Sequence, residues 1–178
     1  MRYLPLSEAR AGPIWRRPEA FLVLTAIAMP LSFSVWSALL NNFVIEAASF
    51  DGADIGWLHT VREIPGLLAI GVIAIIVFIR EQVLALSMLI VLGAATAVTA
   101  FFPTMGGILA VTMISSIGFL YYETANQSLQ LQWLDRKRAP QVLGWLLAAG
   151  SAATLVAYGL IVLTWRAFEL DYSTVYMA

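Results

Sequence analysis

The chain of 178 residues has no cysteine and a single histidine, His59. The lack of cysteine excludes disulfides and thiolate metal sites, and a lone histidine has no second one with which to hold a metal ion. No glycine-rich phosphate loop, serine–histidine–aspartate set or zinc-binding HExxH helix is present. The sequence therefore predicts neither an enzyme nor a bound cofactor or metal, and it identifies no catalytic residue.

Charge is also scarce. Charged residues make up 12% of the chain and the net charge is −1, whereas soluble domains contain about 25% charged residues. No basic excess favours a nucleic-acid partner. Apolar residues make up 61% of the chain, and the mean hydropathy is +0.84. This composition predicts an integral membrane protein whose first partner is the lipid bilayer.

Long apolar runs are what the sequence does contain. A hydrocarbon core of about 30 Å needs about 20 apolar residues per helix. Five stretches are long enough: 20–40, 58–79, 83–102, 107–130 and 142–165. The expected fold is all-α, with five transmembrane helices and antiparallel neighbours joined by short links. It divides into a cytoplasmic segment (1–19), a five-helix bundle (20–166) and an extracytoplasmic tail (167–178).

The basic residues predict the orientation of this bundle. Arg62 and Arg166 fall on one side, against eight basic residues on the other: Arg2, Arg10, Arg16, Arg17, Arg80, Arg136, Lys137 and Arg138. Basic residues accumulate on the cytoplasmic side of membrane proteins. We therefore expect a multi-pass protein of the cell (inner) membrane, with a cytoplasmic N-terminus and an extracytoplasmic C-terminus.

The stretch from Gly107 to Trp133 carries an unusual polar stripe. Its members follow helical spacing and fall within roughly 100° of arc: Thr112, Ser116, Glu123, Asn126, Gln127 and Gln130. A carboxylate at the centre of a membrane helix costs about 2.5–3.5 kcal/mol on insertion scales, so the stripe should face protein or water rather than lipid. Two interpretations remain open: a water-filled surface that faces a ligand, or hydrogen-bonded packing between helices.

Two further polar groups lie near the first loop. Pro30 interrupts the first span, where it can kink the helix and shape a cavity with Ser37 and Asn41; alternatively, the serine hydroxyls simply satisfy backbone carbonyls. Glu46, Arg62 and Glu63 form a candidate outer ion pair, the alternative being that these charges snorkel to water. Asp54 is the expected N-cap of the second span.

The last span contains small residues at four-residue spacing. Gly144, Ala148 and Ala152 form one row, with Ala149, Ala153 and Ala157 beside it. Small residues let membrane helices approach closely. We expect this helix to pack on the fourth span or on the first.

The order of these features resembles the N-terminal half of a major facilitator superfamily transporter. The resemblance is carried by ALLNNFVIEAASFDGADIGWLHTVREIPGLLAI and YYETANQSLQLQWLDRKRAPQVLGWLLAAGSAATLVAYG, with a short link after the second span, a basic link after the fourth and a small-residue fifth span. Such transporters have two six-helix halves with the substrate between them. The resemblance implies that the residues of the first and fourth helices line the substrate path, namely Ser37, Asn41, Ser116, Glu123 and Gln127.

The leading hypothesis is thus a secondary transporter of small solutes that works by alternating access, with Glu123 as the candidate for proton coupling and Asn126 beside it. The chain would be a fragment or half of that transporter, and its partners would be the solute and the missing C-terminal half or another membrane subunit. The alternative is a subunit that packs against another membrane protein and transports nothing.

Overall fold

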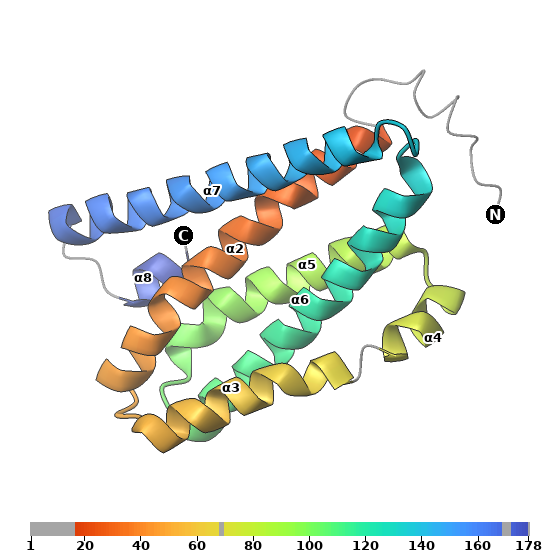
Figure 1. Ribbon diagram of the computed structural model, residues 1–178. Coiled ribbons are helices and arrows are strands. Elements are labelled where there is room, and N and C mark those ends of the chain that lie inside the picture. The colour runs from red at the N-terminus through yellow and green to blue at the C-terminus, as the bar shows by residue number, and fades with distance from the viewer. Residues whose placement is uncertain (1–16, 68–69, 169–171, 178) are drawn as a thin grey trace.

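The computed structural model describes residues 17–67, 70–168 and 172–177, without the side chains of 166–168. Within these ranges the chain forms helices and no strand. In chain order they are α2 (Pro18–Glu46), α3 (Gly52–Leu67), α4 (Ile70–Phe78), α5 (Glu81–Val98), the 3-10 turn η2 (Thr99–Phe101), α6 (Met105–Trp133), α7 (Ala139–Phe168) and α8 (Tyr172–Met177) (Figure 1). Most of the predicted cytoplasmic segment, including Arg2, Arg10 and Arg16, lies outside the described residues, as does Glu169 in the tail.

Four of the described helices are long and apolar enough to cross a membrane: α2, α5 extended by η2, α6 and α7. The pair α3 and α4 makes a fifth span if it is counted as one, but it bends by 48° at its break. The prediction of an all-α multi-pass membrane protein is confirmed at this level. The predicted span 58–79 corresponds to this bent pair rather than to one straight helix. Pro65 and Gly66 come just before the break, and these residue types weaken a helix by removing a hydrogen bond and by their low helix propensity.

The start of α3 corrects a second prediction. Asp51, not Asp54, is the N-cap: its Oδ1 accepts hydrogen bonds from the backbone N–H groups of Ala53 (2.8 Å) and Asp54 (2.9 Å). Asp54 reaches back, and its Oδ2 accepts from the N–H of Asp51 at 3.1 Å. The two carboxylates form a reciprocal capping box, and negative charge in the first turn also suits the helix dipole. Asp51 is therefore engaged at the helix start rather than with Arg62.

The helix α6 is central to the packing. It packs closely along α5 and also contacts α3 and α2, whereas α7 packs chiefly on α2. Figure 1 shows the result: α7 lies on one side of the bundle and α3 on the other, with α2, α5 and α6 between them. The polar face of α6 therefore has α2 and α7 beside one part of it and α3 beside another.

Two glycines permit the closest helix contacts. A Cβ built on Gly118 of α6 would lie 3.0 Å from the backbone of both Met88 and Leu92 in α5. A Cβ on Gly150 of α7 would lie 2.9 Å from the carbonyl oxygen of Ala26 in α2. The expected close approach of the last span is thus made to the first span, and α6 is not its main partner.

The two predicted rows of small residues differ in burial: in the second row Ala149 and Ala153 are half-buried and Ala157 is buried. Gly150 and Ala157 are buried, whereas Gly144, Ala148 and Ala152 are exposed. The exposed row contributes only Gly144 to a groove described below. Four-residue spacing indicates a face on which helices can approach, but this helix has small residues on two faces, and packing selects one of them.

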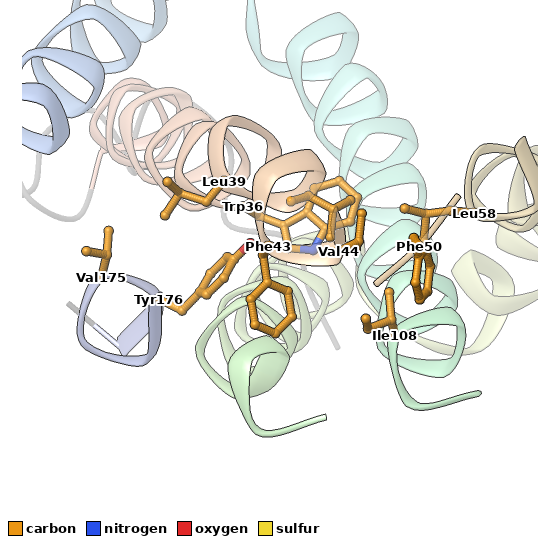
Figure 2. Close-up of a cluster of buried hydrophobic side chains, with 10 residues drawn as sticks. Trp36, Leu39, Phe43, Val44, Phe50, Leu58, Ile108, Val175 and Tyr176 are labelled. Atoms are coloured by element: carbon orange, nitrogen blue, oxygen red, sulfur yellow. The ribbon is translucent and has the colours of Figure 1, made fainter. Parts of the chain in front are cut away.

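One end of the bundle, which we call the α8 end, holds an apolar core. It brings together the end of α2, the starts of α3 and α6, and α8. Figure 2 shows Val175 and Tyr176 of α8 on one side of Trp36 and Phe43, and Leu58 and Ile108 on the other. The rings of Phe43 and Tyr176 meet edge to face with centroids 5.8 Å apart. Part of the predicted tail is therefore a packed element of the bundle.

A hydrogen bond adds to the docking of α8. The hydroxyl of Tyr172 donates to Oε2 of Glu46, at the end of α2, at 2.6 Å, and the Tyr172 ring packs on Trp165 with centroids 5.2 Å apart. Burial, this hydrogen bond and the negative charge of Glu46 together raise the pKa of Tyr172 from 10.0 to about 12. Burial likewise raises the pKa of Tyr176.

The docking of α8 is expected to be lost at high pH. Because the folded-state pKa of Tyr172 is raised, the protonated hydroxyl stabilises docking fully below pH 10.0, and this contribution disappears as the pH rises through about 12. Titration of tyrosinate absorbance, followed together with Trp165 fluorescence, should show both changes in this window. In the Tyr172→Phe variant the change in Trp165 fluorescence should be smaller, because only the ionisation of Tyr176 still contributes to it. An unaltered titration in that variant would contradict the assignment.

Candidate functional site

The polar stripe of α6 opens into a groove, which we call the Glu123 groove. It has a volume of about 500 Å³ and lies between α2, α6 and α7. Its polar lining comes from α6 and α7: Tyr122, Glu123, Asn126, Gln130, Ser151 and Thr154. A volume of this size is typical of small-molecule sites, which have about 300–1,000 Å³ and a few polar groups in an apolar lining.

Glu123 and Asn126 line this groove, and neither side chain is fully engaged by hydrogen bonds. Glu123 is half-buried, and its Oε1 accepts from Nε2 of Gln127 at 3.3 Å, a long hydrogen bond. Asn126 is only 7% exposed, and its Oδ1 has no hydrogen-bond partner among the described residues. Leaving a buried acceptor unsatisfied costs about 1–3 kcal/mol, so water or a ligand in the groove would stabilise this arrangement.

The wall of the groove opposite α6 depends on a proline and a glycine. Pro30 has no N–H to donate to the carbonyl of Ala26, one turn earlier in α2. Gly150 of α7 packs at this point, since a Cβ there would meet the Ala26 oxygen at 2.9 Å and the Pro30 Cγ at 3.2 Å. All three residues line the groove. Pro30 thus lies where α7 approaches α2.

A second, smaller cavity, the Arg62 cavity, lies toward the α8 end. Its volume is about 190 Å³, and α2, α3, α5 and α6 all contribute to it. The lining residues are Phe33, Trp36, Arg62, Glu63, Leu92, Ser115, Ser116, Phe119 and Leu120. Phe33 and Phe119 stack with ring centroids 4.7 Å apart.

Arg62 is the principal charge of this cavity. Its guanidinium carbon lies 6.0 Å from the centre of the Phe33 ring, and its Nε lies 3.7 Å from Oε1 of Glu63. The Glu63 side chain is 78% exposed, so this pair is weak compared with a buried, bidentate one. The Arg62 side chain is 34% exposed and therefore sits partly within the protein.

The predicted site residues separate into several groups. Glu123, Asn126 and Gln130 meet in the Glu123 groove, and Ser116 lies in the Arg62 cavity with Arg62 and Glu63. Gln127 is exposed beside Glu123, and Thr112 is buried in α6. Glu46 bonds to Tyr172 instead of joining Arg62. Ser37 is half-buried, Asn41 is exposed, and neither lines the two cavities described here.

Several residues of these sites escaped the sequence reasoning. Phe33, Trp36 and Phe119 shape the Arg62 cavity but look like ordinary apolar residues of membrane helices. Glu81, at the start of α5, accepts hydrogen bonds from Ser128 (2.9 Å) and Gln132 (2.6 Å) of α6. Ser128 and Gln132 are four residues apart, and that spacing on a second polar face of α6 was the available signal for this contact.

The two cavities lie on the same face of one helix. Ser116 and Glu123 are seven residues apart on α6, which corresponds to about 10 Å along its axis. Phe119 and Tyr122 lie between them in the sequence, one lining each cavity. Among the described residues there is no group of three acidic, histidine or cysteine side chains able to hold a metal ion. The arrangement offers hydrogen-bond donors and acceptors to water or to a polar solute.

Comparison with known proteins adds no relative: the chain matches no family model, no curated protein and no solved structure.

Proposed function

We propose that this chain is part of a secondary transporter of small solutes, of the major facilitator type, which works by alternating access in the cell (inner) membrane. The observation that carries the proposal is the polar face of α6, which contributes to a cavity toward each end of the bundle. In a helix that only supports the fold, a half-buried carboxylate and an unsatisfied buried amide in a groove of about 500 Å³ would cost free energy without a benefit. A helix along a solute path needs such groups.

The pairing of the helices supports the same proposal. The first span, α2, packs on the fifth, α7, and the fourth, α6, packs on the second, α3. If the first span is exchanged with the fourth and the second with the fifth, the pair of spans one and five becomes the pair of spans four and two. Spans one and four run in opposite directions, so this exchange is the relation expected between inverted repeats, from which many transporters are built.

The excess of basic residues on one side favours a cytoplasmic N-terminus, and in this proposal the Glu123 groove then faces the cytoplasmic half of the membrane. Glu123 would exchange a proton with that side. Alternating access requires a second bundle against which this one rocks. We propose that the C-terminal half of the transporter, or another membrane subunit, supplies it.

A subunit that transports nothing is the second candidate, and the exposed surface of α7 favours it. Leu147, Leu155, Leu160 and Leu163 are all more than half exposed, and α7 packs chiefly on α2. Such a surface suits lipid, and it equally suits a partner helix. In this alternative the Glu123 groove is dry and filled by the partner.

Cysteine labelling tests the two proposals without knowledge of the solute, because the native chain has no cysteine. Ser151→Cys places a thiol in the Glu123 groove, and Leu155→Cys places a matched thiol one turn further along α7, where the side chain is 73% exposed and faces lipid in our proposal. A membrane-impermeant maleimide should label the thiol at position 151 rapidly in inside-out vesicles. It should label the thiol at position 155 slowly, because thiolate reaction requires water.

Orientation and hydration are measured in the same experiment. Labelling of Ser151→Cys in right-side-out vesicles but not in inside-out ones would contradict the proposed orientation. Equal, slow labelling of both variants from both sides would show a dry groove, and the subunit would then be the better explanation.

A further inference from the structure

The Arg62 cavity is lined by residues that offer hydrogen-bond donors. Trp36 is 1% exposed and Ser115 is 2% exposed, and neither the indole Nε1 nor the Ser115 hydroxyl has a hydrogen-bond partner among the described residues. An indole and a guanidinium can only donate, and a serine hydroxyl can donate in any direction its rotation allows. The indole Nε1 and the Ser115 hydroxyl are both buried in the wall, so an occupant that brings acceptors would satisfy them after a small adjustment of the lining side chains.

The positive charge of Arg62 also favours a ligand that brings hydrogen-bond acceptors. Its ionic contact with Glu63 is made through Nε alone at 3.7 Å, and Glu63 is largely exposed. A guanidinium has five N–H donors in a planar fork that suits two oxygens of one anion. The contact with Glu63 therefore leaves the outer edge of the fork available for a carboxylate.

The position of Arg62 within the bundle favours an anionic ligand in the cavity. Trp36 lies ten residues before the end of α2 at Glu46, Arg62 ten residues after the start of α3 at Gly52, and Ser115 ten residues after the start of α6 at Met105. At 1.5 Å per residue all three lie about 15 Å inside the α8 end of their helices, so they share one level of the bundle. A guanidinium that is only 34% exposed among apolar side chains is stabilised by a counter-anion.

The size and walls of the cavity limit the occupant. Its volume of about 190 Å³ equals that of about six water molecules in the liquid. The stacked rings of Phe33 and Phe119 supply an apolar part of the lining beside Arg62. This combination fits a small organic acid with a flat or short apolar body, and a large polyanion would not enter.

We propose that the Arg62 cavity is a binding site for a small carboxylate. The Arg62 guanidinium holds the carboxylate, and the Trp36 indole N–H and the Ser115 hydroxyl donate further hydrogen bonds to it. Phe33 and Phe119 pack on the apolar part of the ligand. The site binds whether or not the chain transports, so its test is an equilibrium measurement that is independent of the proposed function.

The experiment uses the full chain in nanodiscs of phosphatidylcholine, titrated calorimetrically with benzoate and with benzamide as the neutral isostere. Benzoate should bind saturably and benzamide at least about tenfold more weakly, because charge-assisted hydrogen bonds are lost. Arg62→Gln should weaken benzoate binding by about 10–100-fold. Glu63→Gln removes a neighbouring negative charge and should tighten it. Arg136→Gln, an exposed arginine outside the cavity, should leave it unchanged.

Two results would overturn the proposal: equal affinity of Arg62→Gln and the native chain for benzoate, or equal affinity of benzoate and benzamide. If Arg62→Gln does not fold, Arg62→Lys and Glu63→Gln decide, with a weaker and a tighter site expected respectively. The titrations are repeated with phosphatidylglycerol in the nanodiscs. Displacement of benzoate by this lipid, dependent on Arg62, would make the cavity a lipid headgroup site and would also overturn the proposal.

Discussion

Replacement of Glu123 by Gln is expected, in the transporter proposed above, to reduce pH-driven uptake to the background of cells that lack the protein. Glutamine keeps the size of the side chain and its hydrogen bond with Gln127 but cannot gain or lose a proton. Helix packing should be little affected, because Glu123 is half-buried in an open groove. The measurement is uptake as a function of external pH, normalised to the amount of protein in the membrane.

Glu81→Gln is the matched control. Glu81 is also a half-buried carboxylate that contacts α6, but its oxygens are engaged by Ser128 and Gln132 rather than facing the groove. This variant should lower stability modestly while the pH dependence of uptake is retained. Uptake by Glu123→Gln with an unchanged pH profile would show that Glu123 is structural.

The substitution Gly150→Ala is expected to destabilise the bundle by about 1–3 kcal/mol, the usual cost of overpacking. The added Cβ would lie 2.9 Å from the Ala26 carbonyl oxygen and 3.2 Å from the Pro30 Cγ. Neither neighbour can move away easily, because one is backbone and the other is a rigid ring. The helix α7 must therefore separate from α2. Unfolding in mixed micelles by increasing denaturing detergent, followed by helix content, measures the change.

Gly144→Ala and Gly159→Ala provide controls within the same helix. An added Cβ at either position meets nothing within 4 Å. These substitutions should be neutral or slightly stabilising, because alanine is favoured over glycine in a helix by about 0.5–1 kcal/mol. A similar response at positions 144, 150 and 159 would contradict the assigned α2–α7 contact.

When Gly150→Ala is combined with Ser151→Cys, the rate of maleimide labelling should also change, since residue 150 forms part of the groove wall.

Composition and periodicity by themselves determined the class of this protein and one polar face. Runs of about 20 apolar residues predict spans without reference to any other part of the chain, because the bilayer thickness acts on each helix separately. The spacing from Thr112 to Gln130 likewise placed Glu123 and Asn126 on one side of α6, because the helical repeat depends only on local geometry. The bend between α3 and α4 was missed, although Pro65 and Gly66 marked the region.

Tertiary structure alone decided which faces meet. A membrane helix is apolar on almost all sides. It therefore lacks the contrast between an apolar and a polar side that orients a helix in a soluble protein, and close packing selects the side that contacts its neighbour. Gly150 rather than Gly144 contacts α2, and Phe119 stacks on Phe33, more than eighty residues away in the sequence. The meeting of Trp36, Arg62 and Ser115 in one cavity depends on the rotation and axial shift of three helices. Hydrophobic periodicity carries no information on the axial shift, and it indicates the rotation only where a helix has a polar face, as α6 does.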